Sequence, residues 1–271
     1  MPDLLSSVVG LICGLLMGLT GAGGTLFAVP LLLLVVGLSV QQAVPLALIA
    51  VSLAGAAGSL LGLHAGLVRY RAAALMAVCG LSMAPLGYSV AAYLPESLLR
   101  ILFSAVMLAV AMRMWFSADQ EMVAGEAGIW QLARRHPQTG RFIWRPAMAA
   151  GLAGIGASAG FLAGLLGVGG GFILVPALRA FTDLEIRSAV ATSLLCLTLI
   201  STGTVVILFL QGHADSVPHA LPFVAGAVVG VGAGRLLTRR LPQVWQQRGF
   251  AVLLLPVAML LIFQGLSIAF R

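Results

Sequence analysis

Residues 14–34 read GLLMGLTGAGGTLFAVPLLLL, and residues 160–180 read GFLAGLLGVGGGFILVPALRA. When the chain is shifted by 146 residues, so that position 14 lies on position 160, nine of the first seventeen positions are identical. The identical positions include most of the clustered glycines and a closing Val-Pro pair, Val29–Pro30 and Val175–Pro176. An internal repeat at a fixed offset indicates that the chain consists of two similar halves. The glycine clusters indicate that each half interrupts a helix at the same place.

The composition is that of a membrane protein. Of the 271 residues, 61% are hydrophobic and only 8% are charged, whereas soluble domains carry about 25% charged residues. A soluble fold with so few charges would have no surface to present to water. The net charge of +7 arises because all fifteen basic residues are arginines beside apolar runs. We interpret them as topology signals, and nucleic acid is not an expected partner.

Apolar segments are separated by short polar breaks, and the two halves match in the number, order and length of these segments. The segments are 4–21, 25–37, 42–64, 72–93 and 98–116, then 147–166, 172–182, 188–210, 217–238 and 248–270. The sequence therefore predicts an all-α polytopic membrane protein with about eight to ten membrane segments. We divide it into a first repeat (1–116), a cytoplasmic linker (117–146) and a second repeat (147–271).

The arginines predict that the halves have opposite orientations. Arg69 and Arg71 follow the third segment, so this end is cytoplasmic by the positive-inside rule. Arg179 and Arg187 flank the turn 183–186, which is then also cytoplasmic. The turn after the first glycine cluster consequently lies outside, and the turn after the second lies inside. We therefore expect two inverted-topology repeats in the cell inner (plasma) membrane, with both termini outside and the 117–146 loop in the cytoplasm.

Two segments are too short to cross the membrane as helices. Segments 25–37 and 172–182 have about twelve residues each, which cover roughly 18 Å of helix against a hydrocarbon core of about 30 Å. We expect each half to begin with a glycine-broken helical hairpin, followed by three transmembrane helices. In the first copy, the helix should restart between Thr25 and Pro30, because proline suits a first helical turn.

Broken backbone at membrane depth is tolerated where it is buried in protein or lines a wet cavity. A helix that resumes after such a break begins with unpaired N–H groups and the positive end of its dipole, which together suit an anion. The inverted symmetry would bring both helix ends towards one site near the midplane. The candidate substrate-binding residues are Gly21, Gly23, Gly24, Thr25, Gly167, Gly169, Gly170 and Gly171.

The glycine clusters have three alternative interpretations: a phosphate-binding loop, a dinucleotide-binding loop and close helix packing. A phosphate-binding loop lacks its lysine, and a dinucleotide-binding GxGxxG motif has Leu26 at its third glycine position. Close helix packing is the serious alternative, since small residues four apart bring membrane helices together. We favour packing for Gly14, Gly18, Gly160 and Gly164, and a broken-helix site for the clustered glycines.

A GxxGxGGG-like phrase followed by Val-Pro, present twice around an arginine-rich central loop, resembles the TauE/SafE family of membrane transporters, also called the sulfite/sulfonate exporter family. The resemblance covers nearly the whole chain, residues 8–270. It implies transport of small sulfur-containing anions such as sulfite or sulfonates, usually outward. The first copy departs from the pattern because it reads GAGGT where the second reads GVGGG. Thr25 would add a hydroxyl to that arm of the site.

The segment from residue 188 is unusually rich in hydroxyl side chains. They are Thr192, Ser193, Thr198, Ser201, Thr202 and Thr204. Serine and threonine in membrane helices often bond only to their own backbone. Thr192 and Ser193 lie at the predicted cytoplasmic end of the helix, and the family resemblance makes them candidates to line the substrate path.

The apolar segments contain no cluster of His, Asp, Glu or Cys. We therefore expect no cofactor, no metal and no enzymatic activity. The expected partners are a small anionic substrate and the lipid bilayer; a coupling ion (H⁺ or Na⁺) and a homo-oligomer stay open. Two alternatives to a secondary transporter also stay open. One is an anion channel, and the other is a membrane scaffold or assembly factor that transports nothing.

Overall fold

The structure is a computed structural model that describes residues 2–120, 146–182, 184–210, 220–238 and 243–269. In these ranges the chain is helical apart from short turns, as the sequence predicts. The first half contains α1 (Pro2–Thr20), the 3-10 helix η1 (Gly21–Phe27), α2 (Ala28–Leu31), the π-helix η2 (Leu32–Val36), α3 (Val40–His64), α4 (Tyr70–Tyr93) and α5 (Glu96–Gln120). The second half contains α6 (Pro146–Leu166), α7 (Gly171–Phe181), α8 (Ile186–Leu210), α9 (Ala220–Thr238) and α10 (Gln243–Ala269).

In the described part of the chain, six helices are long and apolar enough to cross a membrane. These spans lie in α3, α4, α5, α6, α8 and α10. The segments Gly24–Val36 and Gly171–Phe181 are among the shorter apolar helices, so the predicted short arms are confirmed. Residues 121–145, which make up most of the predicted linker, lie outside the described residues, and the domain boundaries stay a prediction.

Local sequence sets where the elements of the first half begin and end. Gly37 has a left-handed φ of 76° and ends the π-helix η2. Ser39 then starts α3 with a capping box, in which the Gln42 amide donates to Ser39 Oγ and the Ser39 amide donates to Gln42 Oε1. Such reciprocal bonds satisfy amides that have no partner inside the helix. The turn after η2 is therefore set by Gly37, which ends η2, and by Ser39, which caps α3.

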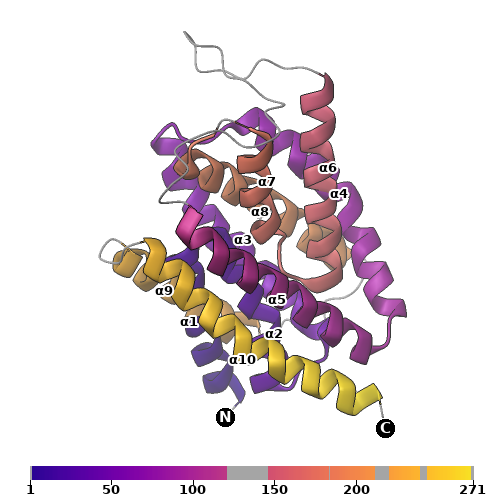
Figure 1. Cartoon of the computed structure of the whole chain (residues 1–271). Coiled ribbons are helices and arrows are strands. Elements are labelled where there is room, and N and C mark those ends of the chain that lie inside the picture. The colour runs from indigo at the N-terminus through magenta and orange to yellow at the C-terminus, as the bar shows by residue number, and fades with distance from the viewer. Residues whose placement is uncertain (1, 121–145, 183, 211–219, 239–242, 270–271) are drawn as a thin grey trace.

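The two halves exchange partners across the molecule. Helix α1 of the first half packs along α9 of the second, and α6 of the second half packs along α4 of the first (Figure 1). Helices α3 and α8 pack against each other, as do α5 and α10. Under the repeat offset α1 corresponds to α6 and α4 to α9, so each partnership maps onto its counterpart. The halves are therefore interlocked, and the two larger clusters of buried hydrophobic residues each contain side chains of both halves.

Small residues allow the exchanged helices to approach closely. A Cβ added to Gly14 would overlap the Ala227 backbone on α9. On the equivalent α6–α4 contact, a Cβ at Gly160 would overlap the Gly80 backbone, and one at Gly164 would overlap Ala84. The prediction that these glycines serve helix packing is confirmed.

A polar cluster joins α5 to α10. The Arg100 guanidinium donates to Glu96 Oε1 at 2.8 Å and to Gln264 Oε1 of α10. The arginine side chain is only 13% exposed, whereas Glu96 is 41% exposed. A charge that is largely removed from solvent requires such partners. Arg100 therefore has a structural role within the fold.

Candidate functional site

The first glycine cluster reverses the chain while keeping a helical backbone. A Cβ on Gly24 would overlap the backbone of Met17, although seven residues of continuous α-helix would separate the two by about 10 Å. Residues Gly21–Phe27 nevertheless form a 3-10 helix that runs directly into α2 at Ala28. The predicted restart between Thr25 and Pro30 is confirmed at Ala28. The predicted break in the α-helix is present between Thr20 and Ala28, but the intervening residues form a 3-10 helix whose tighter geometry makes the turn.

The second glycine cluster does leave the helix. Gly167, Gly169 and Gly170 have φ values of 68°, 69° and 69°, a left-handed conformation that glycine adopts without strain. Helix α7 follows with Gly170 as its N-cap, and its first internal bonds run from the amides of Ile173 and Leu174 to the Gly170 carbonyl. The amides of Gly171 and Phe172 therefore precede the hydrogen-bond ladder, as predicted for an anion-binding helix end.

The two clusters meet inside the molecule. A Cβ on Gly167 would lie 2.9 Å from the Cγ2 atoms of Val29 and Val44, so the second cluster contacts the chain directly after the first. A Cβ on Gly169 would lie 2.9 Å from Val51 Cγ1 and 3.4 Å from Leu197 Cδ2. The second cluster thus packs against α2, α3 and α8 together.

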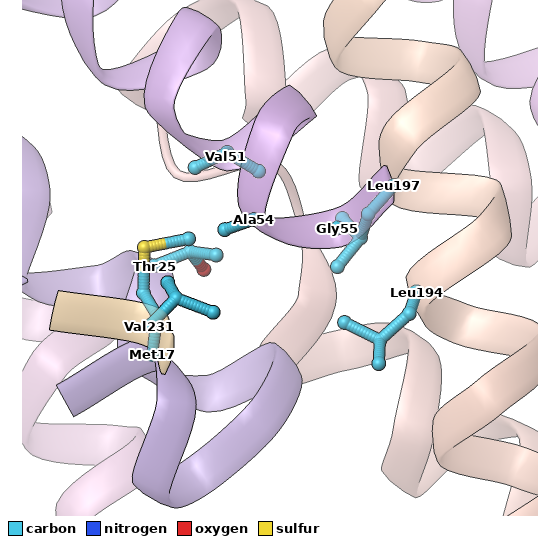
Figure 2. A pocket seen from close by; sticks show the side chains of 8 residues that line it. All are labelled: Met17, Thr25, Val51, Ala54, Gly55, Leu194, Leu197 and Val231. Atoms are coloured by element: carbon cyan, nitrogen blue, oxygen red, sulfur yellow. The ribbon is translucent and has the colours of Figure 1, made fainter. Parts of the chain in front are cut away.

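A small cavity lies beside this junction. It is lined by Met17, Thr25, Val51, Ala54, Gly55, Leu194, Leu197 and Val231. Figure 2 shows Met17, Thr25 and Val231 on one side, with Leu194 and Leu197 of α8 facing them. The centre of a water-sized sphere can occupy about 10 Å³ of it, which is room for about one water molecule. In this conformation the cavity is too small for an oxyanion.

The cavity carries no charged side chain, and its polar lining comes from Thr25. Thr25 is buried, with 2% of its surface exposed. Both halves contribute to the lining, since Thr25 follows the first glycine cluster while Leu197 lies on α8 of the second half. Any anion held here would depend on hydroxyls and backbone amides rather than on an ion pair.

The predicted site residues divide into three groups. Thr25 lines the cavity, and Gly169 contacts the two lining residues Val51 and Leu197. Gly24, Gly167 and Gly170 form the reversals behind it, with Gly170 only 2.6 Å (at its Cβ position) from the Ala159 carbonyl oxygen. Gly21 and Gly23 belong to η1, and Gly171 is the first residue of α7.

The two hydroxyls predicted at the start of α8 differ in their bonding. Thr192 Oγ1 accepts a hydrogen bond from the Arg69 amide at 3.1 Å, which joins the α3–α4 turn to α8. Ser193 is fully buried, and its hydroxyl has no hydrogen-bond partner among the described residues. Thr192 thus has an evident structural role, whereas the fold gives Ser193 none.

Most of the cavity lining could not be found from sequence. Met17, Val51, Ala54, Leu194 and Val231 are ordinary residues of apolar helices, and nothing in their spacing distinguishes them from lipid-facing neighbours. Gly55 carried a weak signal, because a glycine in the middle of α3 suggests close approach. A Cβ there would lie 2.6 Å from Thr198 Oγ1 on α8.

Within the described residues, no group of three or more His, Cys, Asp or Glu side chains could hold a metal ion. Among the histidines, His64 is exposed at the end of α3, where Nδ1 lies 2.9 Å from the Leu60 carbonyl oxygen. His213 and His219 lie outside the described residues.

Comparison with known proteins gives a consistent result. Residues 6–261 match the family model "Sulfite exporter TauE/SafE". A "Probable membrane transporter protein" of Xylella fastidiosa (strain Temecula1) is 32% identical over 94% of this chain and 93% of its own length. The "Probable membrane transporter protein YunE" of Bacillus subtilis (strain 168) is 24% identical over 96% of this chain and 97% of its own length.

No solved structure matches the chain at a significant level. The family model nevertheless covers almost all of the described helices, including both glycine clusters and the cavity between them. Apolar helices, relatives named as membrane transporters and the family match therefore agree. The chain belongs to the TauE/SafE family, and it is a multi-pass membrane protein of a transporter family.

Proposed function

We propose that this protein is a secondary transporter that moves small anions of the sulfite or organosulfonate type across the cell inner membrane by alternating access. The observation that carries the proposal is the meeting of the two glycine clusters beside one buried cavity, with Thr25 on its wall and Gly169 against Val51 and Leu197. The name of the matching family supplies the substrate class.

The chemistry at this junction suits an anion better than a cation. No carboxylate lines the cavity, and the positive end of α7 begins at Gly171 beside the left-handed turn. Helix N-termini bind oxyanions through free amides and the helix dipole. Neutral binding of this kind also allows release, since no fixed opposite charge traps the substrate. We assign substrate contact to Thr25, to Ser193 and to the backbone of the glycine clusters.

The small size of the cavity indicates a conformation closed to the substrate, which both an alternating-access transporter and a gated channel would have. A conducting channel needs a continuous wet path, whereas this cavity has room for about one water molecule. We interpret the conformation as closed, with transport requiring the α3 and α8 walls to separate. The exchange of helix partners between halves would couple movement of one half to the other.

We further propose the inverted arrangement of the two repeats, with both termini outside and the central linker in the cytoplasm. In Figure 1, α1 begins and α10 ends towards the lower edge of the molecule, while α6 begins at the upper edge. The reciprocal partnerships of α1 with α9 and of α6 with α4 support a two-fold relationship. A coupling ion, H⁺ or Na⁺, would drive the cycle.

Flux in proteoliposomes tests the proposal. Purified protein should give saturable sulfite uptake that an organosulfonate inhibits and an equal concentration of acetate does not. Imposed gradients of H⁺ and of Na⁺, applied separately, identify the coupling ion by which gradient drives accumulation. Uptake that rises linearly without saturation would favour the channel, and no anion flux in any condition would favour a scaffold.

A further inference from the structure

The hydroxyl groups of α8 fall into two classes. Some donate a hydrogen bond within the helix, and others have no hydrogen-bond partner among the described residues. Thr198 Oγ1 donates to the Leu194 carbonyl at 2.8 Å, and Thr204 Oγ1 donates to the Ile200 carbonyl at 2.7 Å. This is the usual bonding of hydroxyls in membrane helices. Ser193 and Ser201 differ, because each is 0% exposed and neither hydroxyl has a partner among the described residues.

Ser201 faces the second glycine cluster. Its Oγ lies 3.5 Å from the Cβ position of Gly169, beside Val51 Cγ1 and Leu197 Cδ2. These two hydrophobic side chains also line the cavity, so the cavity and the Ser201 hydroxyl share the neighbours Val51 and Leu197. Gly169 is one of the left-handed residues directly before α7, whose first free amides follow at Gly171 and Phe172.

A fully buried hydroxyl without a hydrogen-bond partner in the described part of the chain, such as that of Ser201, destabilises the folded protein. Ser201 lies close to the middle of the 25-residue helix α8, far from either end. A buried hydroxyl without a partner costs folding free energy, and Thr198 and Thr204 on the same helix avoid this cost. A cost of this kind is typical of a group whose partner is a ligand.

We propose that Ser201 is an anion ligand of the transport site. When the Val51 and Leu197 side chains move apart, the cavity extends to Ser201, and the hydroxyl donates a hydrogen bond to an oxygen of the bound oxyanion. The anion then lies between Thr25 of the first half and the left-handed turn before α7 of the second. This inference rests on the proposed function and adds a specific ligand to it.

The test compares Ser201→Ala with Thr204→Val in the full-length protein. Both changes remove a fully buried hydroxyl from α8, but only the Thr204 hydroxyl is bonded within the helix. The measurements are the thermal midpoint in detergent without and with sulfite, and KM for sulfite flux in proteoliposomes. Methanesulfonate serves as a second probe of the same site.

For Ser201→Ala we expect KM to rise about tenfold, the loss expected for one hydrogen bond to a charged group. The thermal midpoint without anion should stay the same or rise, because the variant loses an unsatisfied group, and the stabilisation by sulfite should shrink. Thr204→Val should lower the anion-free midpoint and leave KM unchanged.

An unchanged KM in Ser201→Ala, with wild-type protein transporting, would overturn this inference alone. A raised KM together with a lowered anion-free midpoint would also overturn it, since the hydroxyl would then support the fold. If wild-type protein shows no saturable response to either anion, the proposed function fails and this inference fails with it.

Discussion

The backbone amide of Arg69 donates a hydrogen bond to Oγ1 of Thr192, 123 residues later in the chain, at a distance of 3.1 Å. The bond joins the turn between α3 and α4 in the first half to the first turns of α8 in the second. Thr192 is fully buried, so no solvent can replace its oxygen if it is removed. The Thr192 side chain thus bonds α8 of the second half to the α3–α4 turn of the first half.

Thr192→Val should therefore destabilise the protein by about 1–3 kcal/mol, the cost of leaving a buried amide without an acceptor. Thr192→Ser keeps the oxygen and serves as the control. Thermal unfolding of the purified protein in detergent measures the difference between them. Equal midpoints for the valine and serine variants would mean that the bond contributes nothing to stability.

Two glycines on α6 provide a matched pair for the packing of α6 against α4. A Cβ on Gly156 would overlap the Met76 backbone, whereas a Cβ on Gly154 meets nothing within 4 Å. Gly156→Ala should force the helices apart and lower the yield of folded protein. Gly154→Ala should be neutral or stabilise by up to about 1 kcal/mol, through higher helix propensity. Size-exclusion profiles and thermal midpoints compare the two variants, and the reverse order would contradict this packing.

Thr25→Val tests the first arm of the site. The change preserves shape but removes a hydroxyl from a buried residue that also interacts within the fold, so the thermal midpoint should fall and KM is measured on the folded protein. Loss of its hydroxyl from the cavity wall should raise KM for sulfite about tenfold, the effect of one hydrogen bond to a charged group. Thr25→Ser keeps the hydroxyl and should transport with near wild-type KM. Wild-type kinetics in Thr25→Val would remove Thr25 from the site.

The inverted topology can be tested by labelling from one side of the membrane. Gln41 and Glu185 are both exposed; Gln41 lies in the first turn of α3 and Glu185 directly precedes α8, so each marks the connection after one of the two glycine clusters. In a background with Cys13, Cys79 and Cys196 replaced by alanine, Gln41→Cys should react with an impermeant maleimide in intact cells. Glu185→Cys should react only after permeabilisation. Labelling of both from the same side would rule out the inversion.

The helices were predictable because their signals are local and strong. The apolar runs and the breaks between them set the bounds of α3, α4 and α8 to within a few residues. The short arms followed from length alone, since Gly171–Phe181 cannot cover a bilayer. The close packing at Gly160 and Gly164 followed from small residues four apart.

The site was less predictable, because its geometry depends on contacts between distant segments. The two glycine clusters look alike in sequence, yet Gly21–Phe27 stays helical while Gly167–Gly170 turns left-handed. Nothing in the sequence separates the Ser201 hydroxyl from the Thr204 hydroxyl as a ligand, since both belong to the same apolar helix segment. The two differ only in whether a carbonyl one turn earlier accepts the hydroxyl proton, which tertiary structure decides.

The unlike form of the two short arms has an energetic consequence. In the proposed inverted repeat, identical copies would make the inward-facing and outward-facing states equivalent by a two-fold rotation and equal in free energy. Here one arm combines a 3-10 helix, one turn of α-helix and a π-helix, whereas the other is a regular α-helix behind three left-handed glycines. Under the proposed alternating access, this difference removes that equality, so the resting population of the two states, and with it the side from which substrate is first accepted, would be set by the protein itself.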